Sequence, residues 1–174
     1  MAIDLGGLLQ QYLGATAAQP TGNAPDHFQQ VAQSAPAGVV SHGLSEAFRS
    51  DQTPPFGQMV AQLFAQGTPD QRAGMLQQLL GSLNPAALSA LAGSGALGGL
   101  AASASAAPAA ISPQQASQLT PAQVEQIAAH AEQHNPSVID AMSNFYAQHT
   151  GLVQTLGSAA LTVCLAKIAT RMRA

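Results

Sequence analysis

The sequence predicts an all-α protein, a bundle of short proline-capped helices that ends in an apolar C-terminal helix. A capping residue stands before proline at five places, and proline's fixed φ and missing N–H suit the first position of a helix. Between these starts, apolar residues recur at helical spacing. Gln71 and Gln123 complete capping boxes at two of the starts. The five starts are Thr68-Pro69, Asn84-Pro85, Ser112-Pro113, Thr120-Pro121 and Asn135-Pro136.

The apolar periodicity also predicts the order of the elements. A short amphipathic helix over 4–14, with Asp4 as its N-cap, is too short to be stable alone and must dock on the body, a partner or a membrane. Each of the longer helices that follow is predicted from its apolar face, and a last helix over 151–173 completes the chain. The longer predicted helices cover 26–34, 36–50, 55–66, 69–82, 85–92, 121–134 and 136–149.

Four segments follow from this pattern. Residues 1–24 hold the short helix and a linker, 25–93 a helical N-terminal unit, and 111–174 a C-terminal helical unit in which 120–173 forms three helices. Gly, Ala and Ser dominate 94–110, which reads as a flexible linker. The rival interpretation of 94–110 is a buried, tightly packed segment of small residues.

Charged residues make up only 7% of the chain, and the formal net charge is -3. Such weakly charged surfaces tend to associate, although a monomer rich in Ala and Gln is the alternative. Five basic residues are too few for a nucleic-acid interface. Cys164 is the only cysteine, so no intramolecular disulfide forms. The N-terminus lacks a basic signal-peptide region, so we expect a cytoplasmic protein, free or at the inner face of the membrane.

The segment Gly151–Arg173 is apolar on nearly every side, and such a helix must be buried in a core, an interface or a membrane. Its small residues recur every four positions, which lets helices approach closely. Polar residues and Lys167 weaken insertion into a bilayer. A packed core helix and an oligomer interface therefore remain as the main readings. The candidate interface residues are Leu152, Leu156, Ser158, Leu161, Thr162, Leu165, Ala166 and Ile168.

Two alternative sites are also present in the sequence. His130 and His134 are four residues apart on one helix, a spacing at which two imidazoles can share a metal, although two solvated histidines are the simpler reading. His149 is a candidate third ligand that nothing in the sequence places nearby. The candidate membrane contacts combine apolar residues of the first helix with a basic tail. They are Leu5, Leu8, Leu9, Leu13, Lys167, Arg171 and Arg173.

Nothing in the sequence points to an enzyme. No two carboxylates form a recognisable acid–base pair, and Ser41-His42 lacks the context of a nucleophile elbow. The glycines at 93, 95, 98 and 99 follow no strand, so they predict no phosphate-binding loop. We therefore expect no catalytic residue and no cofactor.

The start GGLLQQYLG, the Gly/Ala-rich centre and the S/T-P-x-Q helix starts resemble the small bacterial YidB-like proteins. The resemblance is one of pattern and covers about two thirds of the chain. That family is an all-helical group of uncharacterised function, so the resemblance implies the fold class and no activity.

The leading hypothesis is a non-enzymatic, self-associating helical scaffold or adaptor. It would form a homo-oligomer, join a larger protein complex and tether that complex to the membrane. The alternatives are a peripheral lipid-binding protein and a metal site at His130 and His134.

Overall fold

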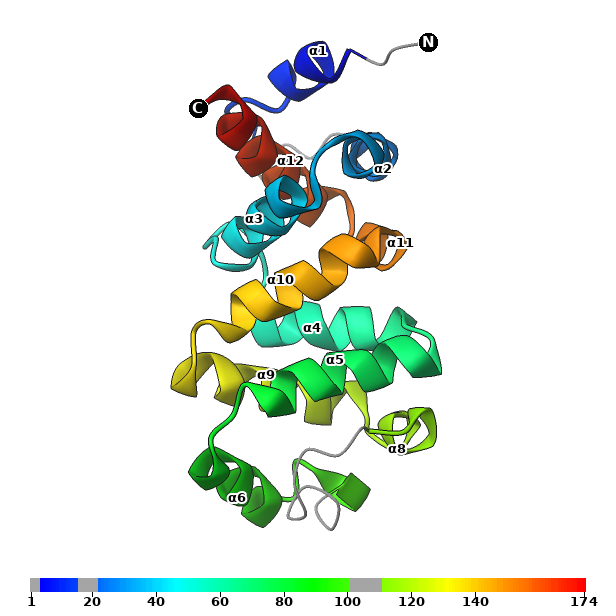
Figure 1. Cartoon of the computed structure of the whole chain (residues 1–174), viewed down its shortest axis with the longest axis vertical. Coiled ribbons are helices and arrows are strands. Elements are labelled where there is room, and N and C mark those ends of the chain that lie inside the picture. Colours follow the sequence, from blue (N-terminus) through cyan, green and yellow to red (C-terminus); the bar gives the residue numbers. More distant parts are fainter. Residues whose placement is uncertain (1–3, 16–21, 101–110) are drawn as a thin grey trace. The chain divides into compact units, whose positions relative to one another are not determined.

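The structure is a computed structural model that describes residues 4–15, 22–100 and 111–174. Regular structure within these ranges is entirely helical, which confirms the predicted all-α class (Figure 1). The α-helices are α1 (Leu5–Gln10), α2 (Ala24–Ser34), α3 (Ala37–Phe48), α4 (Phe56–Gln66), α5 (Pro69–Gly81), α6 (Pro85–Ser94), α8 (Pro113–Ser117), α9 (Pro121–His134), α10 (Val138–Gln148), α11 (Thr150–Val153) and α12 (Ser158–Arg173). Two short 3-10 helices are η1 (Gly98–Leu100) and η2 (Gln154–Leu156).

Local side-chain chemistry starts four of these helices as predicted. At α9, Thr120 Oγ1 accepts a hydrogen bond from the Gln123 N–H at 3.3 Å, and Gln123 Oε1 accepts one from the Thr120 N–H at 2.9 Å. The same capping box begins α5 at Thr68 and Gln71. Asn84 caps α6, and Ser112 begins α8 with a third capping box, beyond the two predicted.

The fifth predicted start, Asn135-Pro136, is a turn instead. Asn135 is the C-cap of α9, and α10 begins only at Val138. The Asn135 amide donates to the Ser82 carbonyl at 3.0 Å, and its Oδ1 accepts from the Ser137 N–H at 3.2 Å. The side chain therefore ties the turn after α9 to the end of α5.

The chain forms two compact units that do not follow the order of the sequence. The first unit comprises Met1–Pro55 and Ser143–Ala174, and the second comprises Phe56–Met142. This grouping differs from the division expected at 25–93 and 111–174, because α12 packs on α3 and α2 while α9 packs on α4. Helices 121–134 and 158–173 thus belong to different units, and 120–173 is not a three-helix unit of its own.

The first unit is organised around the crossing of α3 and α12 (Figure 1). Gly43 of α3 lies at this crossing, where a Cβ atom would fall on Ile168 Cγ1 and lie 3.2 Å from the Cys164 carbonyl oxygen. The missing side chain therefore allows the two helices to approach closely. Phe48 of α3 and Leu165 of α12 are among the buried core residues.

The second unit contains a comparable close contact between α4 and α9. A Cβ atom at Gly57 would lie 2.8 Å from the Glu125 carbonyl oxygen. α5 packs on both α8 and α9. Of the predicted linker, Ala96, Leu97 and Leu100 are buried while the other residues of 94–100 are exposed, so this part is only partly buried, and 101–110 lie outside the described residues.

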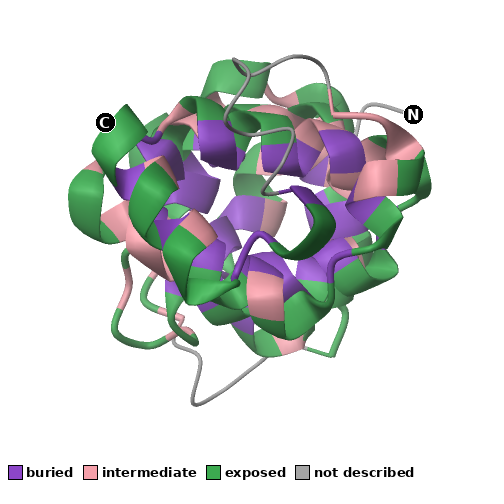
Figure 2. Cartoon of the chain, turned by 90° about the horizontal axis from the view of Figure 1, so that it is seen from below, coloured by how far each residue is buried: buried purple, intermediate pink, exposed green. Residues whose placement is uncertain are grey.

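The expected helix over 151–173, apolar on nearly every side, is not confirmed. Gly157 has a φ of 89°, a left-handed conformation that suits glycine, and it separates η2 from α12. α12 also has a solvent-exposed face, which includes Ala159, Lys167 and Thr170. The chain therefore buries one side of a shorter helix, and its last residues are exposed (Figure 2).

Candidate functional site

Most of the predicted interface residues lie inside the chain's own core. Leu152, Leu161, Thr162, Leu165 and Ile168 are buried, and only Leu156, Ser158 and Ala166 are half-buried. The Thr162 hydroxyl donates to the Ser158 carbonyl of its own helix at 2.7 Å. This burial favours the core-helix reading of α12 over the interface reading.

The N-terminal helix packs on the rest of the first unit. This is one of the three expected arrangements, the others being contact with a partner or with a membrane. Leu9 and Tyr12 are buried, and the Tyr12 hydroxyl and His27 Nδ1 form a hydrogen bond of 2.6 Å. The two rings also meet edge to face, with centroids 5.8 Å apart. No motif links these residues in the sequence, and the contact could not be predicted from it.

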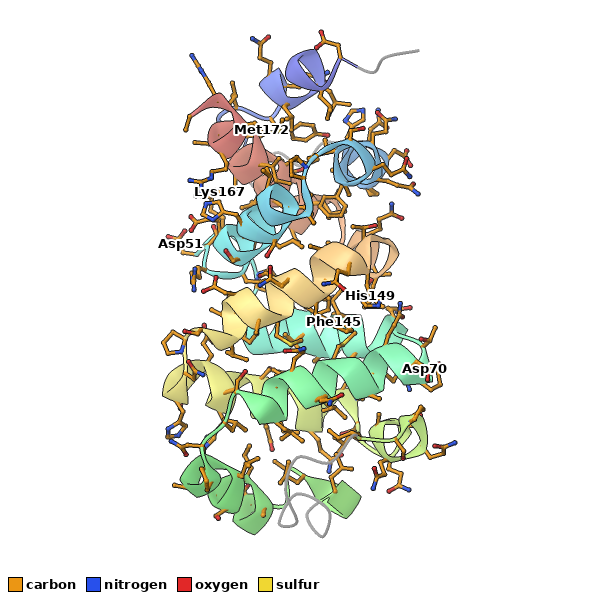
Figure 3. All side chains as sticks on the ribbon, in the orientation of Figure 1. Asp51, Asp70, Phe145, His149, Lys167 and Met172 are labelled. Carbon is orange, nitrogen blue, oxygen red and sulfur yellow. The ribbon has the colours of Figure 1, made fainter. Side chains whose placement is uncertain are left out.

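Docking leaves part of the first helix uncovered beside the end of α12. Leu5, Leu8 and Leu13 are half-buried. Met172, which Figure 3 labels near the end of α12, is 45% exposed. Arg171 and Arg173 are exposed on either side of Met172. We name this surface the α1–α12 end and define it by Leu5, Leu8, Leu13, Lys167, Arg171, Met172 and Arg173.

The basic side chains at this end are not neutralised by the fold. Lys167 lies one helical turn before Arg171 and on the same side of α12. Within the described part of the chain, Lys167, Arg171 and Arg173 take part in no side-chain hydrogen bond or ion pair. The carboxylate of Asp4, the acidic residue at the start of α1, accepts a hydrogen bond from the Gly7 N–H at 3.1 Å. The α1–α12 end is therefore both partly apolar and positively charged.

The two candidate metal ligands lie on one face of α9. The His130 and His134 rings have centroids 4.4 Å apart, and His130 Nε2 is buried without a hydrogen-bond partner among the described residues. His149, the candidate third ligand, belongs to the other unit, where its ring stacks on Phe145 and its Nδ1 lies 2.9 Å from the Phe145 carbonyl oxygen. In the ranges that the structure describes, no three His, Cys, Asp or Glu side chains gather as metal ligands would.

The strongly perturbed ionisable groups are both buried in the first unit. Burial raises the pKa of the Tyr146 hydroxyl and of the Cys164 thiol far above their ordinary values. Both groups therefore stay neutral at physiological pH. A reactive cysteine needs the opposite shift, toward the thiolate, so Cys164 behaves as an inert core residue.

Tyr146→Phe is expected to stabilise the protein by about 1 kcal/mol, because the Tyr146 hydroxyl is buried with no hydrogen-bond partner in the described part of the chain. Urea unfolding followed by circular dichroism measures the change. Tyr12→Phe is the matched comparison and should lose about 1 kcal/mol, since it removes the bond to His27. Equal destabilisation by both substitutions would show that the Tyr146 hydroxyl has a partner in solution.

No helix in the described ranges is both long and apolar enough to cross a membrane. The chain matches no family model, no curated protein and no solved structure. The resemblance to YidB-like proteins therefore stays a prediction from the sequence pattern.

Proposed function

We propose that the protein is a non-enzymatic, self-associating helical scaffold or adaptor whose contact surface is the α1–α12 end. The observation that carries this proposal is the exposure of Met172 at 45%, beside three incompletely buried leucines at the first helix. Among the described residues Met172 is the exposed large hydrophobic side chain. A single exposed apolar side chain is ordinary on a protein surface, whereas a contiguous apolar patch rimmed by polar residues is typical of an interaction site, so the proposal depends on Met172 together with the three half-buried leucines.

This surface takes the place of the candidate interface on the last helix that was predicted from the sequence. An interface built on Leu161, Leu165 and Ile168 would require α12 to leave α3, which would open the core of the first unit. The α1–α12 end is accessible in the folded chain without any such rearrangement.

The two ionisable groups with strongly raised pKa values, Tyr146 and Cys164, do not support a catalytic role. Catalytic groups are usually tuned by neighbouring charges toward the pH at which they act. Desolvation is the cause of the raised pKa of Tyr146 and of Cys164, and it holds both groups neutral. Neither group is thereby poised as a nucleophile or as a base.

Self-association through the α1–α12 end is expected to be weak and to strengthen with salt. Few side chains form this end, whereas a stable interface buries about 800 Å² on each partner. Two copies would also bring Arg171 and Arg173 near their counterparts, and salt screens that repulsion over a Debye length of about 10 Å at 0.1 M.

Light scattering at high protein concentration, in about 0.05 M and about 0.5 M salt, tests this expectation. The mean mass should rise above the 17.6 kDa of one chain at high salt. Met172→Ser should keep the mass at one chain, while Ala159→Ser, an exposed control on α12, should behave as the wild type. A mass of one chain for every variant at both salt concentrations contradicts self-association.

A further inference from the structure

We infer that the α1–α12 end docks on an anionic lipid surface, so that the protein is held at a membrane by this end. The inference rests on the proposed function only in taking the α1–α12 end as the contact surface. It does not require self-association, which would occupy the same end and compete with the membrane.

Charge complementarity identifies the partner as anionic. Three of the five basic residues of the chain, Lys167, Arg171 and Arg173, lie in the last turns of α12. The remaining acidic residues of the first unit lie on α2, on α3 and in the turn after α3, as Asp26, Glu46 and Asp51. The whole chain carries a formal net charge of -3, so an anionic surface attracts this end while repelling the rest.

The apolar part of the same end favours a lipid surface over an acidic protein segment. Met172 is 45% exposed between Arg171 and Arg173 in the sequence, and Leu5, Leu8 and Leu13 of the adjoining N-terminal segment are half-buried, so this end carries apolar as well as basic groups. A bilayer interface accepts apolar side chains between headgroups and requires no matching pocket. Basic and apolar contacts together are the two signals that stable peripheral binding needs.

Flotation of the full chain with lipid vesicles tests the inference. Vesicles of phosphatidylcholine with about 30 mol% phosphatidylserine should bind the protein at about 0.05 M salt, and binding should fall strongly at about 0.5 M salt. Vesicles of phosphatidylcholine alone should bind far less. Each basic residue near an anionic surface raises partitioning about five-fold, so Arg171→Gln together with Arg173→Gln should lower it about 25-fold.

Single substitutions provide the matched controls. Arg49→Gln changes the net charge as much as Arg171→Gln does, but Arg49 is the C-cap of α3 and is not one of the residues of the α1–α12 end. Arg49→Gln should leave partitioning onto the vesicles nearly unchanged. Arg171→Lys, which keeps the positive charge, should bind as well as the wild type does. Met172→Ser should weaken binding to the phosphatidylserine vesicles without changing its salt dependence.

The salt dependence separates this inference from the proposed self-association, because vesicle binding weakens with salt and self-association strengthens. Absence of binding to the phosphatidylserine vesicles at low salt overturns the inference. Equal losses for Arg49→Gln and Arg171→Gln would also overturn it, since the effect would then come from net charge alone.

Discussion

Gly43→Ala is expected to destabilise the first unit by about 3 kcal/mol, the upper part of the range for overpacked cores. The added methyl group would fall on Ile168 Cγ1 of α12, and the Cys164 carbonyl oxygen lies 3.2 Å from the same position. A side chain can change rotamer, but a helix backbone cannot yield without moving the whole of α12. The substitution therefore forces apart the two helices that form the core of this unit.

Gly38→Ala is the control for this prediction. Gly38 lies in the same helix and is exposed, and a methyl group added there would meet no described atom within 4 Å. Alanine there should stabilise the helix by up to about 1 kcal/mol through its higher helix propensity. Urea unfolding of both variants measures the contrast. Equal stabilisation by the two substitutions would mean that α3 and α12 do not meet closely at Gly43.

Local chemistry explains why much of the fold could be predicted. The capping box of Thr120 and Gln123 involves residues three positions apart, so the sequence alone determines where α9 begins. The same is true of the α5 start at Thr68. For the amphipathic helices, the side that is buried also follows from their own periodicity, but for α12 it does not, since the sequence there is apolar on nearly every side.

What each helix packs against could not be predicted, because it depends on contacts between distant residues. Gly43 of α3 meets Ile168 of α12, far along the chain. Tyr12 forms a hydrogen bond with His27, and no sequence motif links the two residues. The apolar residues of α12 show that this helix must be covered, but they do not show whether α3 or a second copy of the chain covers it. The same pattern is therefore compatible with a core, an interface or a membrane helix.

The candidate site was predictable only in part, for the same reason. The basic residues Arg171 and Arg173 and the leucines of the first helix are visible in the sequence as separate groups. Their meeting at one end of the first unit depends on how α1 packs on α12, which is a tertiary contact. The sequence pattern does not distinguish Met172 from the apolar residues earlier in α12, which are buried while Met172 is exposed.

Leu165→Ala is expected to destabilise the protein by about 3 kcal/mol, the cost of a cavity in a packed core. Leu165 is fully buried within the chain. Leu156→Ala should cost about 1 kcal/mol or less, because Leu156 is only half-buried in η2. Urea unfolding gives both values.

The Cys164 thiol adds a second, local measurement of the same effect. It is the only cysteine, it is buried, and it lies next to Leu165 in α12. Its reaction with a thiol reagent requires α12 to open, so Leu165→Ala should speed labelling far more than Leu156→Ala does. If α12 were instead an interface between copies, Leu165→Ala would leave the stability of the monomer unchanged and would lower the mass of the assembly. A destabilised chain of unchanged mass therefore identifies α12 as a core helix and leaves the α1–α12 end as the surface for partners.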